Sequence, residues 1–252
     1  MARPNDHTKH RIAVVTGGAS GIGLGIVEAL TRDGFHCVAA SRHPERSPCA
    51  GGTAIATDIT KTNDVERMFA RVEADLGGLD VLVNCAGVVS GGRLEAQSDA
   101  AIEAQLAVNL FGTIIATRGA LALLRASKGV VINIGSTLAH RPGPGVSIYA
   151  ATKGAVEAFT RAMASELAAD GIRVLAVLPS LVRSDIWTSA GMSPEAVDAL
   201  MVARAGEYPL GRVGEPADVA DMVAYLASAK ASWMTGVCIP VDGGALLGPR
   251  RQ

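Results

Sequence analysis

The sequence predicts an α/β fold: a doubly wound parallel sheet of about seven strands, with helices on both faces, in a single domain spanning residues 1–252. Short β-branched runs alternate with longer amphipathic stretches along the chain. This alternation is typical of parallel strands joined by right-handed crossovers. Most of the short runs are apolar at every position, as expected for strands that helices cover on both faces. No linker-like segment or internal repeat divides the chain.

The predicted elements follow one another in a regular order. Strands are predicted at residues 11–16, 36–40, 53–57, 79–84, 129–135, 172–178 and 237–241. Apolar residues at helical spacing lie between them, and two long helices are predicted over residues 106–125 and 149–169. Segment 180–212 is the longest departure from this rhythm, and it leaves a strand at the carboxyl edge of the sheet, where ligands bind in open α/β folds. We therefore expect this segment to form a substrate lid.

Composition excludes several classes of function. The chain carries 23 Lys and Arg against 24 Asp and Glu, so it has no electrostatic footprint for nucleic acid or an anionic membrane. No apolar run reaches the roughly 18 residues needed to span a bilayer. The 4 cysteines are scattered and the 5 histidines form no cluster, which predicts neither a disulfide framework nor a metal site. A cytoplasmic protein is expected.

A glycine-rich turn follows the first predicted strand and reads TGGASGIG over residues 16–23. Gly17 can adopt positive φ in a tight turn. Gly21 lets backbone N–H groups approach a pyrophosphate at the start of a helix, and Gly23 lets that helix pack closely on the strand. No Gly-Lys-Ser/Thr follows, so the turn is not a P-loop. Taken alone, it indicates either a dinucleotide site or a glycine-rich turn without a ligand.

Further motifs follow this turn in order. They are NCAG at 84–87, Asn109, Ser136, Tyr149 with Lys153, RVGEP at 212–216, MTG at 234–236 and DGG at 242–244. In this order and spacing the sequence resembles the short-chain dehydrogenase/reductase family over almost its whole length. The similarity is to the compact, single-domain members, such as the 3-oxoacyl-acyl-carrier-protein reductases. It implies a Rossmann-type fold and an NAD(P)-dependent oxidoreductase that needs no metal.

Tyr149 and Lys153 lie four residues apart at the start of a predicted helix, so both side chains project from one face. A positive charge about 5 Å from the phenol, at an effective dielectric of about 20, is worth roughly 3 kcal/mol, or about two pKa units. We therefore expect Lys153 to bring the pKa of Tyr149 toward neutrality. The resemblance implies that Tyr149 exchanges the proton, Lys153 binds the nicotinamide ribose, Ser136 binds the substrate oxygen and Asn109 holds a water of a proton relay.

The resemblance also implies which residues hold the dinucleotide. They are Gly17, Ser20, Gly21, Ile22, Gly23, Ser41, Arg42, Asp58, Ile59, Asn84, Ala86, Gly87, Pro179, Val182 and Ser184, together with Tyr149 and Lys153. Asp58 is the expected adenine contact.

The second predicted strand ends at Ser41, where a relative that prefers NAD would carry an acidic residue for the ribose hydroxyls. Arg42 follows and could pair with the 2′-phosphate of NADP, or it could be a solvated loop residue. Against NADP, Ser20 stands where many NADP-preferring relatives carry a basic side chain. On the strength of Ser41 and Arg42, NADP is the expected cofactor, with NAD as the alternative.

Three positions depart from the family pattern: Ser180 replaces a usual Gly, Ser184 a usual Thr, and Cys85 a common Asn. The substrate stays open among a β-ketoacyl group, a specialised ketone, a steroid-like alcohol and a sugar. Residues expected to line its site are 88–92, 137–141, 146, 181–183 and 187. Arg141 and Arg183 could clamp a substrate carboxylate, or they could be solvated.

Three functions compete. The first is an NADP(H)-dependent ketoreductase that interconverts a ketone or aldehyde and an alcohol. The second is an NAD-dependent alcohol dehydrogenase acting oxidatively, and the third is a dinucleotide-binding sensor without turnover. The expected partner is a small carbonyl or alcohol substrate. A homo-oligomer, tetramer or dimer, is expected through the two long helices.

Overall fold

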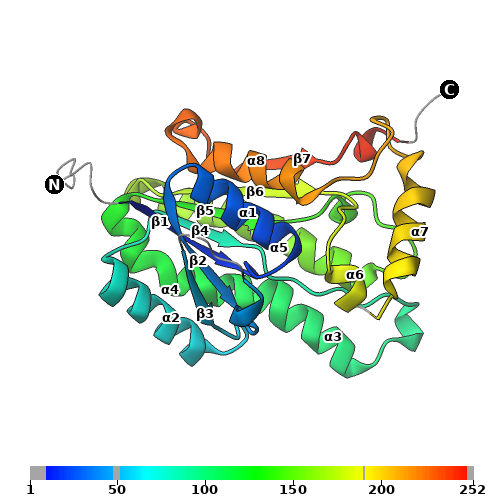
Figure 1. Cartoon of the computed structure of the whole chain (residues 1–252), viewed down its shortest axis with the longest axis horizontal. Helices are drawn as coiled ribbons and strands as arrows, with labels where there is room; N and C mark the ends of the chain where they lie inside the picture. The colour runs from blue at the N-terminus through cyan, green and yellow to red at the C-terminus, as the bar shows by residue number, and fades with distance from the viewer. Residues whose placement is uncertain (1–9, 48–51, 190, 249–252) are drawn as a thin grey trace.

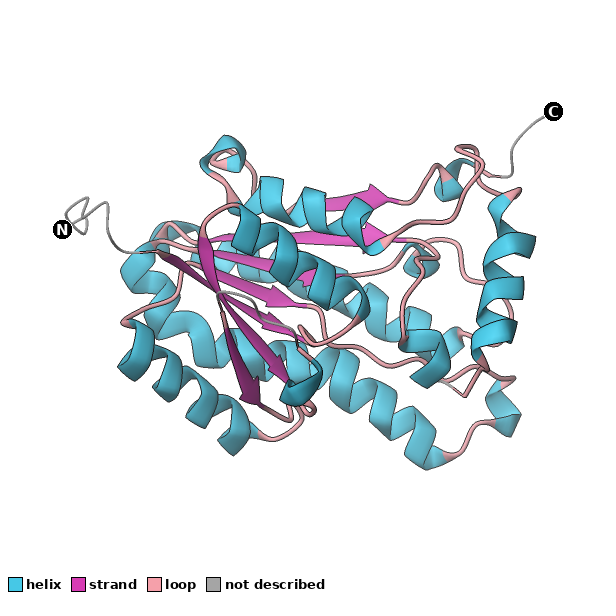
Figure 2. Cartoon of the chain, in the orientation of Figure 1, coloured by secondary structure: helices cyan, strands magenta, loops and turns pink. Residues whose placement is uncertain are grey.

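The computed structural model describes residues 10–47, 52–189 and 191–248. Its centre is a seven-stranded sheet in which every neighbouring pair is parallel, in the order β3-β2-β1-β4-β5-β6-β7 (Figures 1 and 2). The strands are β1 (Arg11–Thr16), β2 (Phe35–Ser41), β3 (Thr53–Ala56), β4 (Val81–Asn84), β5 (Val130–Ile134), β6 (Arg173–Pro179) and β7 (Cys238–Val241). The direction of winding reverses between β1 and β4, which opens a crevice at their carboxyl ends.

Helices cover both faces of the sheet. The helices are α1 (Gly21–Arg32), α2 (Thr62–Leu76), α3 (Asp99–Leu106), α4 (Gly112–Ser127), α5 (Ser147–Leu167), α6 (Ile186–Ser189), α7 (Pro194–Ala205) and α8 (Pro216–Ala227). Helices α1 and α8 pack on one face, and α2, α4 and α5 on the other (Figure 1). Along β1, Ala13 and Val15 face the first core while Ile12 and Val14 face the second, so continuous apolar runs were required. The predicted α/β fold is therefore confirmed, and all seven strands lie within two residues of their expected ends.

The helical stretch before β5 is longer than the sequence predicted. It begins at Asp99, where the Ser98 hydroxyl accepts from the N–H of Ala101 at 3.2 Å. It then continues through a π-helical turn, Ala107–Phe111, into α4. Within Asp99–Ser127 an 18-residue window has a mean hydropathy of 1.6, so the stretch is long and apolar enough to cross a membrane by length and composition. The core helix of a soluble protein passes the same test, and α4 packs on the sheet within the second core.

Segment 180–212 lies beyond the carboxyl ends of the strands and contains α6 and α7 (Figure 1). It has a small core of its own, built from Val197, Met201 and Tyr208 together with Val213. Val182, at the start of the segment, packs instead in the first core of the sheet and so fastens the segment to it.

Candidate active site

A cavity of about 960 Å³ runs along the carboxyl edge of the sheet. It is bounded by the glycine turn, the ends of β2, β4, β5 and β6, the start of α5 and the segment with α6 and α7. Among the residues expected to hold cofactor or substrate, the cavity is lined by Gly17, Ser20, Gly21, Ile22, Gly23, Ser41, Arg42, Asp58, Ile59, Ala86, Gly87, Ser136, Tyr149, Lys153, Pro179, Val182 and Ser184. Asn84 and Asn109 are absent from this lining.

The glycine turn has the geometry that a pyrophosphate needs. Gly17 has φ +70°, and a Cβ there would stand 2.9 Å from the Cα of Ala86. A Cβ at Gly23 would stand 2.1 Å from the carbonyl oxygen of Gly17, so only glycine lets α1 start this close to the turn. Ser20 precedes α1 without a side-chain capping bond, and the first turn carries no acidic residue. The N–H groups at the positive end of α1 thus face the cavity, which fits a dinucleotide phosphate.

The three predicted catalytic side chains meet at the middle of the cavity. Tyr149 and Lys153 come from one face of α5, and Ser136 follows the carboxyl end of β5. Lys153 is buried, donates to the carbonyl oxygen of Ile134 at 2.7 Å, and places its Nζ 5.7 Å from the centre of the Tyr149 ring. The Ser136 hydroxyl accepts from the N–H of Leu138 at 3.2 Å, which fixes its oxygen.

The protonation states of this pair differ from the expectation. Desolvation raises the pKa of Tyr149 to about 12, although a hydrogen bond with Ser136 lowers it, and the neighbouring Cys85 raises it further. Desolvation lowers the pKa of Lys153 to about 8, against a raising effect of Cys85. Lys153 therefore loses its proton well before the phenol ionises. In the chain alone, desolvation thus moves the pKa of Tyr149 away from neutrality, opposite to the expected direction.

The side chains of the two asparagines bond to other residues of the chain around the site. Asn84 turns its amide away from the cavity and donates to Thr117 Oγ1 at 3.0 Å and to Asn133 Oδ1 at 2.8 Å. Its side chain thus joins strands and α4, contrary to the expected cofactor contact. Asn109 lies in the π-helical turn, where its Oδ1 accepts from the N–H of Val88 at 2.8 Å and its Nδ2 donates to the carbonyl of Val88 at 2.9 Å. It fixes the segment after β4 beside Lys153, since a Cβ at Gly87 would approach both side chains.

The end of the cavity at β2 carries more positive charge than the sequence indicated. His43 and Arg46 line it together with Ser41 and Arg42. The short 3-10 helix Pro44–Arg46 brings Arg46 back toward the cavity, and the four-residue spacing from Arg42 was the signal available in the sequence.

Asp58 stands across this end of the cavity. Burial alone would raise the pKa of its carboxyl, but hydrogen bonds from Thr60, together with Lys61 and Arg42, hold the pKa below its usual value. Arg42 and Asp58 thus both line the cavity, and the charge of Arg42 acts on the carboxyl of Asp58.

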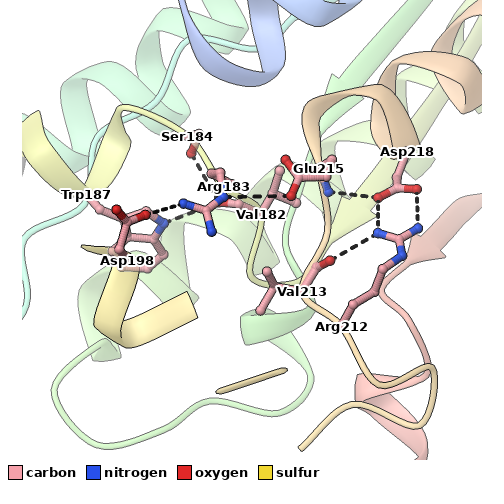
Figure 3. A network of polar contacts seen from close by, with 9 residues as sticks. All are labelled: Val182, Arg183, Ser184, Trp187, Asp198, Arg212, Val213, Glu215 and Asp218. Atoms are coloured by element: carbon pink, nitrogen blue, oxygen red, sulfur yellow. Dashed lines mark hydrogen bonds and ion pairs between the residues drawn. The ribbon is translucent and has the colours of Figure 1, made fainter. Parts of the chain in front are cut away.

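A network of ion pairs ties the segment with α6 and α7 to the start of α8 (Figure 3). Arg183 pairs with Asp198 of α7, and its Nε lies 3.7 Å from Glu215 Oε1. Arg212 holds both carboxylate oxygens of Asp218, at 2.6 and 2.7 Å. The guanidinium of Arg183 is thus engaged outside the main cavity, which argues against a clamp on a substrate carboxylate.

The substrate end of the cavity is formed by the residues that follow Ser136 and by segment 180–208. Of the residues expected here, the cavity is lined by Val88, Val89, Thr137, Leu138, Arg141, Val146, Leu181, Val182 and Trp187. The hydroxyl of Ser180, at the position of the usual Gly, lies 2.9 Å from the hydroxyl of Tyr208, which also accepts from the N–H of Leu181 at 3.1 Å. Leu200 and Arg204 were missed because the sequence did not show which face of α7 looks inward, and Glu207 and Tyr208 because they follow the end of that helix.

Comparison with known proteins places this site in a family. The family model described as enoyl-(acyl carrier protein) reductase matches residues 17–245. The chain belongs to the short-chain dehydrogenase/reductase family. It is therefore a short-chain NAD(P)-dependent oxidoreductase with a site for a nicotinamide dinucleotide.

Proteins named for different activities are similar in sequence to this chain over almost its full length. The chain is 34% identical to 2-(S)-hydroxypropyl-CoM dehydrogenase 3 of Xanthobacter autotrophicus, covering 95% of this chain and 98% of that protein. It is 30% identical to 3-oxoacyl-[acyl-carrier-protein] reductase of Bos taurus, covering 94% and 98%.

Solved structures agree with the fold. A ligand-free aldohexose dehydrogenase of Thermoplasma acidophilum superposes with a TM-score of 0.89 at 31% identity, covering 95% of both chains. The 3-ketoacyl-(acyl-carrier-protein) reductase of Brucella melitensis, complexed with NADH, gives 0.84 at 30% identity, covering 94% of this chain and 98% of that one. These names differ in substrate, so the family fixes the class of reaction and leaves the substrate to the residues of the site.

Proposed function

We propose that this protein is an NADP(H)-dependent reductase that interconverts a ketone or aldehyde and an alcohol, with Tyr149 as the acid and base. The observation that carries the proposal is the meeting of Tyr149, Lys153 and Ser136 in one cavity with the phosphate-binding turn. A sensor without turnover would not need all three groups at this point.

A nicotinamide dinucleotide, when bound, supplies the carbon that gives or takes the hydride. Tyr149 donates its phenolic proton to the substrate oxygen in reduction and accepts a proton there in oxidation. With its pKa raised to about 12, the phenol holds its proton throughout the neutral range, which suits the reductive role. Ser136 hydrogen-bonds the same oxygen, and the Lys153 ammonium stabilises the phenolate that forms, while Asn109 keeps the adjacent segment in place for a water relay.

The direct test measures the reduction of a panel of carbonyl compounds by NADPH, followed through the loss of NADPH absorbance. Tyr149→Phe keeps the ring and removes only the hydroxyl, so turnover should vanish while cofactor affinity stays nearly intact. Substantial reduction by the purified variant would remove Tyr149 from this role.

The preference for NADP rests on the basic end of the cavity. Arg42 and Arg46 both line this end. Ser41 occupies the position where a relative that prefers NAD would carry an acidic residue. Charge-assisted bonds of about 1.5–3 kcal/mol predict that Arg42→Ala lowers NADPH efficiency roughly 10- to 100-fold, with NADH efficiency unchanged. A clear NADH preference of the wild type would overturn this part of the proposal.

An NAD-dependent dehydrogenase acting oxidatively is the second candidate. It is favoured by Ser20, which leaves the turn without a basic side chain, and by the NADH complex of the Brucella relative. The ratio of NADPH to NADH efficiency separates the two candidates.

Assembly, location and the lid belong to the same proposal. We infer a homo-oligomer, tetramer or dimer, in the cytoplasm, that joins through α4 and α5. The exposed apolar side chains of Leu106 and Phe111, on the helical stretch that leads into α4, favour such a contact. Light scattering of the purified chain tests the assembly, and a monomer would refute it.

Segment 180–212 acts as the substrate lid, and protection of α7 from hydrogen exchange on binding substrate is the expected result.

A further inference from the structure

Three charged side chains at the substrate end of the cavity differ in their partners: Arg204 and Glu207 pair with each other, and Arg141 does not pair with a carboxylate among the described residues. Arg204 and Glu207 both line this end, and they neutralise each other, with Nε 3.2 Å from Oε2. Arg141 donates to the carbonyl oxygen of Ala245 at 2.6 Å. Within residues 10–47, 52–189 and 191–248 it forms no ion pair with a carboxylate. Its guanidinium therefore leaves a net positive charge beside the place of the substrate.

Arg141 is fixed to the loop that carries the catalytic serine. Its backbone N–H bonds to the carbonyl of Thr137 at 2.9 Å, one turn after Ser136. The preceding His140 is anchored on α5, with its Nε2 2.9 Å from a carboxylate oxygen of the buried Glu157. The side chain of Arg141 thus extends from a backbone that is held in register with both Ser136 and α5.

The guanidinium of Arg141 is exposed at the cavity and is able to bind an anion. Leu138, Val146 and Leu246 line the same cavity and add apolar surface to it. Hydrogen bonds from a guanidinium to an oxyanion are charge-assisted and stronger than neutral ones. Arg141 has five N–H donors, and one of its nitrogens already serves Ala245, so donors are left for a ligand.

We infer that the substrate of this site carries its own anionic group, a carboxylate or a comparable oxyanion, and that Arg141 binds it while Ser136 and Tyr149 hold the carbonyl oxygen. This inference rests on the proposed reductase activity and adds the class of substrate: short keto acids and the corresponding hydroxy acids. The cofactor phosphates are served separately by the glycine turn and Arg42, at the other end of the cavity.

The test compares short α-, β- and γ-keto acids with their methyl esters, which keep the carbonyl and remove the charge. The wild type should favour at least one acid over its ester. Arg141→Gln should raise KM for that acid roughly 10- to 100-fold, as expected for a lost charge-assisted bond, and leave the ester unchanged. Arg141→Lys should recover part of the loss, because it restores the charge without the fork. Arg71→Gln, a matched change on the exposed face of α2, is the control.

A second readout does not depend on turnover. In the presence of NADP, the hydroxy acid should raise the melting temperature of the wild type and not that of Arg141→Gln. Equal losses on acid and ester would show that Arg141 only fastens the segment at Ala245, and a preference for every ester would also overturn the inference. If no compound is reduced while the hydroxy acid still stabilises the wild type alone, the inference stands and the proposed reductase activity fails for these compounds.

Discussion

Replacing Lys153 by Met tests the electrostatic account of the active site. Nζ lies 5.7 Å from the centre of the Tyr149 ring. At an effective dielectric of about 20, a unit charge at that distance is worth about 3 kcal/mol, or about two pKa units. In the chain alone this effect is not available when the phenol ionises, because Lys153 has lost its proton above a pKa of about 8 while the phenol holds its own to about 12. Lys153→Met should therefore leave the ionisation of Tyr149 nearly unchanged in the protein without cofactor.

A bound oxidised dinucleotide would change this expectation, because a positive charge near the phenol lowers its pKa from about 12. The ionisation of Tyr149 then moves toward the pH range in which Lys153 still carries its proton. In the complex, Lys153→Met should thus leave the pKa of Tyr149 above that of the wild type and slow alcohol oxidation.

The assay is the ultraviolet absorbance of tyrosinate as a function of pH, taken as the difference between each protein and its Tyr149→Phe counterpart. The subtraction removes the other 2 of the 3 tyrosines. The reasoning is refuted if Tyr149 ionises near pH 8 in the wild type without cofactor, or if Lys153→Met moves that ionisation by two units.

Three further predictions follow from burial, backbone geometry and the ion-pair network. Because the folded state holds the pKa of Lys153 at about 8, below its usual 10.5, it binds fewer protons than the unfolded state between these values, and stability should rise with pH across this window. Lys153→Met should accordingly raise the melting temperature at pH 7 and flatten that rise; an unchanged slope would contradict it. Gly17→Ala, at φ +70° and with its Cβ 2.9 Å from Ala86, should destabilise the fold by at least about 1–2 kcal/mol and weaken dinucleotide binding in calorimetry, while Gly206→Ala, with open space around it and φ −69°, should do neither. Arg183→Ala removes an exposed pair worth about 0–1 kcal/mol, so the melting temperature should hardly move, but hydrogen exchange in α7 should quicken; unchanged exchange would show that the pair does not fasten the lid.

The fold was predictable because its main signal lies in local composition. Each strand separates two cores, so alternate residues such as Val14 and Val15 both had to be apolar, and a continuous apolar run marks such a strand at sight. The long helix was predicted too short, because residues 99–105 have a weak apolar pattern and their start depends on the cap at Ser98.

The candidate site was predictable only where residue type determines the role. The glycines of the turn belong to this group, and so do Tyr149 and Lys153 on α5, because residue type and spacing along the chain place them at the cavity. The side chain of Asn84 does not, since its partners Thr117 and Asn133 come from other elements. The role of Arg183 stayed open between a substrate clamp and a solvated residue for the same reason: both of its acidic partners come later in the chain, and the sequence shows only a lone arginine on a loop.

The inverted order of proton loss also sets the pH range in which this pair can act. With its pKa raised to about 12, the phenol holds its proton at neutral pH but is a weak acid, so proton transfer depends on positive charge that stabilises the phenolate. Lys153 offers that charge only while it keeps its own proton, which it gives up near pH 8. Under the proposed chemistry, the Lys153 charge aids the phenolate that reduction leaves and oxidation starts from, and this aid is lost above about pH 8.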